Sequence, residues 1–228
     1  MKNVVQITSS NINIYCIRGL EKFSNDFINY CNNNIGYILE KLGIIKYEKI
    51  IININYMKNN NDNIYGGTNF SGFFNEKGAD VYISLNNGFE NNKIFKAIMH
   101  EITHHLYKYY VYGKKNPRIT WVDEGIAQFI SNQFEEYNED KVYNKFLLDN
   151  LSDINSFNLN ILNHNDRSFG NNNGYNLSYI AIKYLYETNS HDKFIKIIKD
   201  KDLLLNIGTT IIDSIKKYYD INDNRKIK

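Results

Sequence analysis

The chain has 228 residues, which is enough for one domain with a substantial core or for two small lobes. Apolar residues make up 43% of it and charged residues 23%, and both fractions fit an ordinary globular protein. The formal charge of +2 gives no electrostatic reason to expect a nucleic-acid partner or an anionic membrane surface.

Cysteine content and hydropathy exclude further classes of protein. The two cysteines, Cys16 and Cys31, are too few for a disulfide framework and do not form a CxxC pair, so we expect plain buried thiols. The residues after Met1 and Lys2 lack the apolar core of a secretion signal, and no run reaches the ~18 apolar residues of a membrane span. We therefore expect a cytoplasmic protein without a membrane span.

The first elements along the chain are strands around one long helix. The segment INIYCI (12–17) alternates and predicts a strand, and residues 20–42 follow a helical pattern that ends at Gly43, a common helix stop. Residues 49–56 are rich in isoleucine and predict a second strand. After a polar loop, residues 79–85 alternate between apolar and polar side chains and predict a third strand.

Helical patterns follow from about residue 92. Between residues 92 and 112, four aliphatic side chains step by four along one stripe: Ile94, Ile98, Ile102 and Leu106. A second helix is expected from Thr120 to about residue 134, with Asp123 three residues on in a capping-box arrangement.

The remainder of the chain is expected to be helical as well. The predicted helices cover residues 139–151, 176–188, 191–200 and 207–219, and a polar loop that includes SFGNNNG precedes the second of them. Because the strands come first and the helices follow, the order indicates an α+β fold with one sheet and a helical C-terminal part.

The stretch HEITHH, residues 100–105, lies on the first of these helices. At about 100° per residue, His100 and His104 stand roughly 40° apart on one face, and Ile98 and Ile102 stand roughly 160° away from His100. One face is therefore expected to be buried, while the other presents two imidazoles. Two nitrogens one helical turn apart can bind a single Zn²⁺ at about 2.0–2.1 Å each.

The neighbours of this pair have different expected roles. Glu101 lies roughly 100° round from His100, where it can reach a water on the metal but is not placed as a ligand. His105 lies roughly 140° from His100, toward the isoleucine stripe, and we expect a packed, hydrogen-bonded histidine. The plain alternative for His100 and His104 is a polar helix face without a metal.

A third protein ligand is needed for a catalytic zinc site, and the segment TWVDEGIAQF (120–129) supplies the candidate Glu124. Asp123 is an alternative ligand, although its position suits helix capping. The plain reading of Glu124 is a favourable place near the helix dipole. Three apolar residues are expected to give this helix its buried side: Trp121, Ile126 and Phe129.

HEITH followed by WVDEG resembles the gluzincin metallopeptidases, whose pattern is HExxH and then W-x-[ND]-E-G. The similar branch is the aminopeptidase-N-like clan with its short bacterial relatives, the peptidase MA-like proteins, and the likeness covers most of residues 10–220, loosely outside the motifs. The resemblance implies a single zincin-like domain over residues 1–228. It would consist of a sheet-containing lobe (1–90) and a helical lobe (91–228), with the active site between them.

The resemblance also implies the site. It gives Zn²⁺ as the cofactor, with His100, His104 and Glu124 as ligands and Glu101 as the general base. The strand 79–85 would be an edge strand beside the HExxH helix, with a free edge on which an extended substrate could pair.

In that branch a tyrosine at the start of a late helix donates a hydrogen bond to the oxyanion. The match in YNLSYIAIKYL is Tyr175, and Tyr179 lies one turn on. Because the chain holds 19 tyrosines, the plain reading of Tyr175 is a packing aromatic. A thermolysin-type histidine is the other oxyanion donor, for which His164 and His191 are the candidates.

Two features depart from the family pattern. The gap between His104 and Glu124 holds nineteen residues, one more than the commonest aminopeptidase spacing, and an insertion in the loop around 114–118 would absorb it. The segment GGTNFSG (66–72) has no glutamate where those aminopeptidases carry G-x-M-E-N. The resemblance therefore implies cleavage without implying aminopeptidase activity.

Together the motifs predict a zinc-dependent peptidase acting on a peptide or protein substrate, with Asp123 and Gln128 orienting the ligands. Three alternatives stay open: a zinc hydrolase of a non-peptide amide or ester, a non-catalytic binding module on a gluzincin-like fold, and a secreted toxin-like protease. Nothing in the sequence indicates an oligomeric state.

Overall fold

The computed structural model describes residues 4–56, 65–67, 79–85, 91–164 and 168–221. Over these residues the fold is α+β, with a mixed sheet in the N-terminal part followed by helices, as the order of the predicted elements indicated. The chain divides into two compact units, Met1–Leu106 and Tyr107–Lys228.

The first unit is built on a five-stranded sheet over the described residues, in the order β1-β2-β3-β5-β4. The strands are β1 (Val4–Thr8), β2 (Ile12–Ile17), β3 (Ile50–Tyr56), β4 (Tyr65–Gly67) and β5 (Val81–Leu85). The inner pairs β2–β3 and β3–β5 are parallel, and the outer pairs β1–β2 and β4–β5 are antiparallel.

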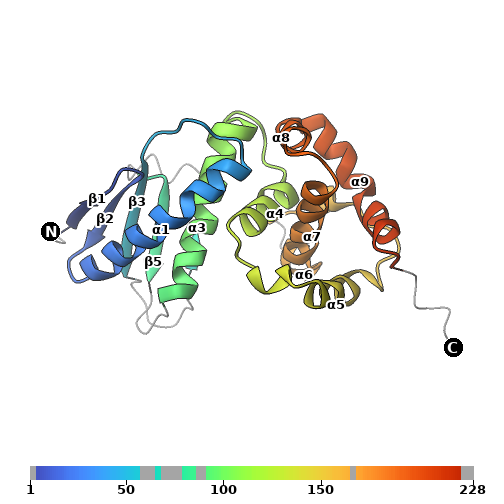
Figure 1. Cartoon of the computed structure of the whole chain (residues 1–228), viewed down its shortest axis with the longest axis horizontal. Helices are drawn as coiled ribbons and strands as arrows, with labels where there is room; N and C mark the ends of the chain where they lie inside the picture. Colours follow the sequence, from blue (N-terminus) through green and yellow to red (C-terminus); the bar gives the residue numbers. More distant parts are fainter. Residues whose placement is uncertain (1–3, 57–64, 68–78, 86–90, 165–167, 222–228) are drawn as a thin grey trace. The chain divides into compact units, whose positions relative to one another are not determined.

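One face of this sheet carries the core of the unit. In the parallel register Ile14 lies opposite Ile52, which lies opposite Val81, so buried side chains form a row across three strands. Two helices, α1 (Glu21–Lys41) and α3 (Asn91–Leu106), contact each other and the sheet (Figure 1). The alternation read from the sequence thus marks the face that the helices cover.

The predicted edge strand is corrected by this topology. The strand within 79–85 pairs with β3 on one side and with β4 on the other, so β5 is an inner strand. Among the described residues β4 is the edge strand on that side, and both β4 and β5 contact α3. A substrate therefore has no free edge on β5 along Tyr82–Ser84, where β4 already pairs with it.

The second unit is helical over the described residues. It begins with a π-helix (Tyr107–Tyr112) that continues directly from α3, and its largest helix contact joins α4 (Thr120–Ile130) to α7 (Gly174–Glu187), which lie side by side in Figure 1. The other α-helices are α5 (Asp140–Leu151), α6 (Ser168–Asn171), α8 (His191–Lys199) and α9 (Lys201–Tyr218). Two short 3-10 turns complete it, Glu135–Asn138 and Leu159–Ile161.

Several helix limits differ from the expected ones. The helix expected over 92–112 becomes a π-helix from Tyr107, and α4 ends at Ile130 rather than near residue 134. The helix expected from residue 207 begins at Lys201, because the Asp200 side chain accepts from the Leu203 N–H at 3.0 Å and caps it. Over the described residues, no helix is both long and apolar enough to cross a membrane.

Candidate metal centre

The two histidines of the HExxH motif lie one turn apart on α3, as the helical spacing predicts. The Nε2 atoms of His100 and His104 are 3.0 Å apart, and the rings stand nearly perpendicular at 86°. Two nitrogens bound to one tetrahedral Zn²⁺ at about 2.0–2.1 Å would stand roughly 3.3–3.4 Å apart. The observed separation therefore needs to open by only a few tenths of an ångström to admit the ion.

The histidine face of α3 is less open than the sequence suggested. His100 is 9% exposed and His104 is 2% exposed, while Ile98 and Ile102 on the opposite side are fully buried. Glu101, the predicted general base, is 8% exposed. The imidazoles and this carboxylate are thus largely shielded from bulk water. Hydrogen bonds and charges act more strongly in such a shielded environment than in water.

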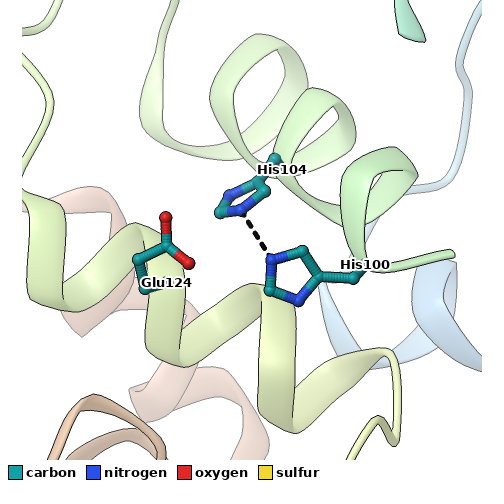
Figure 2. Close-up of side chains that lie close together, drawn as sticks. All are labelled: His100, His104 and Glu124. Atoms are coloured by element: carbon teal, nitrogen blue, oxygen red, sulfur yellow. Dashed lines mark hydrogen bonds between the residues drawn. The ribbon is translucent and has the colours of Figure 1, made fainter. Parts of the chain in front are cut away.

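The predicted third ligand joins the pair. Each of His100, His104 and Glu124 offers one ligand atom, and these atoms all lie within 4.8 Å of one another (Figure 2). Two imidazole nitrogens and one carboxylate oxygen make a donor set that suits Zn²⁺. The residues therefore fit the metal that the resemblance implies.

Asp123 neither caps α4 nor belongs to the candidate ligands in the described part of the chain, and its predicted role in orienting them stays a prediction. The N-cap of α4 is Ile119, and no side chain forms the cap hydrogen bond, so the capping box predicted for Thr120 and Asp123 is wrong. Asp123 is 3% exposed, and its Oδ2 accepts from Nε of Arg118 at 2.5 Å. It also lies outside the group of candidate ligands found among the described residues.

Two residues that the sequence analysis did not assign to this network hold Glu124. Nη2 of Arg118 donates to Glu124 Oε1 at 2.6 Å, and Nε2 of His164 lies 3.0 Å from the same oxygen. Burial by itself would lower the pKa of Arg118, but the charges and hydrogen bonds of Asp123 and Glu124 outweigh it and raise that pKa. No sequence motif marks this arrangement, because Arg118 precedes Glu124 in the sequence and His164 follows it by forty residues.

A pocket of about 290 Å³ adjoins this network. Arg118 and His164 both line it, and so does Asn160, which two hydrogen bonds hold in place. Trp121 Nε1 donates to Asn160 Oδ1 at 3.0 Å, and Asn160 Nδ2 donates to the Leu205 carbonyl at 2.6 Å. Asn160 is therefore hydrogen-bonded on both sides in the wall of the pocket that Arg118 and His164 also line.

The two candidate tyrosines have different surroundings. Tyr175, the second residue of α7, is 42% exposed, and its ring centroid lies 5.8 Å from that of His164. Tyr179 is 2% exposed and packs within a cluster of aromatic rings. The rings around it belong to Phe129, Phe134, Tyr137, Tyr143 and Phe146. Tyr175 is thus the one near a residue that contacts Glu124.

The remaining candidates lie apart from this group. His105 is buried with its Nδ1 3.8 Å from Asp80 Oδ1, and it is not among the candidate ligands of the described residues. His191 is the exposed first residue of α8. The buried Oε1 of Gln128 has no hydrogen-bond partner among the described residues, so its predicted role in orienting a ligand stays a prediction.

Burial in α4 extends beyond the apolar side that the sequence predicted. Asp123, Glu124 and Gln128 are buried together with Trp121, whereas Phe129 is only partly buried. Cys16 and Cys31 are buried free thiols, as predicted.

The likeness to the gluzincins depends on two short motifs, HEITH and WVDEG. A scan against protein-family models gives no match for this chain, and a search of curated proteins gives none either. Membership of that family therefore stays a prediction, and the convergence of His100, His104 and Glu124 is the structural observation that supports it.

Proposed function

We propose that this protein is a zinc-dependent peptidase in which His100, His104 and Glu124 bind the metal and Glu101 is the general base. The observation that carries the proposal is the approach of three donor atoms, one from each ligand residue, within 4.8 Å. Glu101 adds to it, because a purely structural zinc site has no use for a base beside its first ligand.

Zn²⁺, when bound, would lower the pKa of a water molecule from 15.7 toward ~7 and polarise the substrate carbonyl. Glu101 accepts a proton from the attacking water at its carboxylate. It then delivers that proton to the nitrogen of the leaving amine as the C–N bond breaks. Its low exposure of 8% keeps bulk water from competing for that carboxylate.

Tyr175 is the proposed donor to the oxyanion. Its exposed fraction of 42% leaves its ring accessible, and its neighbour His164 contacts Glu124. One donor of this kind typically contributes ~2.7–4 kcal/mol to the transition state. His164 is the alternative donor, and its Nε2, which lies 3.0 Å from Glu124 Oε1, would have to leave that carboxylate to donate to the oxyanion.

The test of this function is peptide cleavage by the purified chain. We expect about one zinc per chain and cleavage of a proteome-derived peptide mixture that a chelator abolishes and zinc restores. Glu101→Gln should keep the metal and lose cleavage, whereas His104→Ala should lose both. His191→Ala removes an exposed histidine elsewhere in the chain and serves as the matched control.

Two results would overturn the proposal. If Glu101→Gln still cleaves peptides, Glu101 is not the general base. If the wild-type chain binds no zinc, His100, His104 and Glu124 do not form a zinc site. Chelator-sensitive hydrolysis of ester or amide probes without peptide cleavage would favour the non-peptide hydrolase.

A further inference from the structure

One arginine holds two neighbouring carboxylates near the proposed ligand. Nε of Arg118 donates to Asp123 Oδ2 at 2.5 Å, and Nη2 donates to Glu124 Oε1 at 2.6 Å. Consecutive residues on a helix diverge by about 100°, so these side chains would otherwise turn in different directions. The planar guanidinium fork brings both carboxylates to one cation, with Asp123 3% and Glu124 6% exposed.

The same oxygen of Glu124 has a second contact. Nε2 of His164 lies 3.0 Å from Oε1, so when that nitrogen carries the proton two N–H groups converge on Oε1. An oxygen that accepts two such bonds is a poor metal donor, which leaves Oε2 as the ligand atom. The contacts therefore favour ligation of the metal through one oxygen of Glu124.

The segment that carries Arg118 is itself anchored. Tyr112 Oη donates to the Pro117 carbonyl at 3.0 Å, just before Arg118, and the Asp123 N–H donates to the Ile119 carbonyl at 3.0 Å, just after it. A long side chain that starts from a fixed backbone loses less entropy when it holds its partners. The fork thus starts from a backbone that is hydrogen-bonded on both sides of Arg118.

We propose that Arg118 is a positioning residue that selects Glu124, in preference to Asp123, as the third metal ligand. The inference depends on the proposed metal site. Arg118 pairs with Asp123 and, with His164, contacts Oε1 of Glu124, which would leave Oε2 available to a metal. Asp123 is the alternative that the sequence left open, and among the described residues it lies outside the group of candidate ligands that includes Glu124.

Charge alone predicts the opposite effect of Arg118. A guanidinium beside a metal ligand repels a divalent cation, so removing it would tighten zinc binding if charge were its only contribution. Positioning predicts weaker binding instead, because partners that orient ligands typically contribute ~10–100-fold to metal affinity. The direction of the change therefore separates the two roles.

The experiment measures the zinc affinity of the metal-free chain by competition with a chromophoric chelator. We expect Arg118→Ala to bind zinc ~10–100-fold more weakly. Arg118→Lys should be intermediate, because an ammonium cannot bridge both carboxylates with a planar fork. Lys115→Ala removes an exposed cation from the same loop and should bind like the wild type.

Chemical rescue separates positioning from a loss of folding. Arg118 lines the pocket of about 290 Å³ and its side chain is 32% exposed, so truncation opens a space that solvent can reach. Ethylguanidinium at low concentration should restore zinc affinity in Arg118→Ala and leave the wild type and Lys115→Ala unchanged. Circular dichroism of all variants should be the same.

Some outcomes would overturn this inference. Zinc binding in Arg118→Ala that is as tight as in the wild type, or tighter, removes the positioning role. Full affinity in Arg118→Lys would show that a single ammonium serves as well as the planar guanidinium, which removes the role of the fork. A wild type without zinc affinity overturns both proposals, whereas zinc affinity without peptide cleavage removes only the proposed function.

Discussion

At Gly125 and Ser178, α4 and α7 approach each other closely. A Cβ added at Gly125 would lie 2.3 Å from the Ser178 carbonyl oxygen and 2.6 Å from Cγ1 of Ile182, so the two helices meet where a side chain has no room. Gly125 directly follows Glu124, so close packing against α7 explains why a glycine stands at this position of the WVDEG motif, next to the proposed ligand.

Gly125→Ala should destabilise the fold by about 1–3 kcal/mol, because backbone must move to admit the methyl group. Gly36→Ala is the matched control: Gly36 is an exposed position of α1, and a Cβ there meets nothing within 4 Å. That variant should gain about 0.5–1 kcal/mol from the better helix propensity of alanine. Chemical denaturation of both variants gives the difference, and equal stability would contradict the close approach.

Asn160 fixes the wall of the pocket beside Arg118. Its side chain accepts from the buried Trp121 indole and donates to the Leu205 carbonyl. Asn160→Ala leaves both partners without that side chain, and we expect a loss of about 1–3 kcal/mol for each group that water cannot reach. Asn206→Ala changes an exposed asparagine one residue after Leu205 and should be nearly neutral in thermal unfolding. A neutral Asn160→Ala would mean that water replaces both bonds.

Local patterns predicted the parts of the fold that carry their own signal. The strand 12–17 and the helix that stops at Gly43 were confirmed, since burial alternates in β2 and Gly43 adopts a φ of 63°. β1 was missed because its burial pattern has no buried position and Val4 is 59% exposed. Such a strand depends on pairing with β2, and this pairing leaves no pattern in the sequence of the strand itself.

The site divides in the same way. The candidate ligands His100, His104 and Glu124 could be proposed from the sequence because their motifs and helical spacing mark them, and the structure brings these three side chains near one another. Arg118 and His164 could not, because their contacts with Glu124 depend on tertiary structure rather than on a repeat. The π-helix that follows the histidines was likewise beyond reach, since the segment YKYYVY fits an α-helix equally well.

Cys31 should be nearly inert in the folded chain. It is fully buried in α1, and burial raises the pKa of its thiol to about 12 from the ordinary value of 9.0. At about pH 8 the thiolate fraction is then on the order of 10⁻⁴, so we expect negligible reaction with a disulfide reagent until denaturant is added. Rapid labelling of Cys31 in the native state would contradict this environment.

The same shift makes the stability of the fold depend on pH. The pKa of Cys31 is higher in the folded state than in the unfolded state, so the folded chain holds more protons between about pH 9 and 12. The contribution is therefore fully present below pH 9 and is lost as pH rises through that window. In Cys31→Ala the free energy of unfolding should fall less steeply between about pH 9 and 12, as measured by denaturation at a series of pH values. An unchanged slope would show that the Cys31 thiol does not cause the pH dependence.

Tyr175 and Tyr179 can be separated by matched removal of one hydroxyl from each. If Tyr175 donates to the oxyanion, Tyr175→Phe should lower kcat by ~10²–10³. Its thermal stability and zinc affinity should stay unchanged, because its ring is 42% exposed. Tyr179 is 2% exposed among other aromatic rings, so Tyr179→Phe should keep kcat within a few-fold and change mainly the unfolding free energy, by about 0.5–1.5 kcal/mol. Steady-state kinetics and denaturation of the two variants decide between them. The reverse pattern would move the oxyanion donor to Tyr179, and a full kcat in both variants would leave His164 as the residue to replace next.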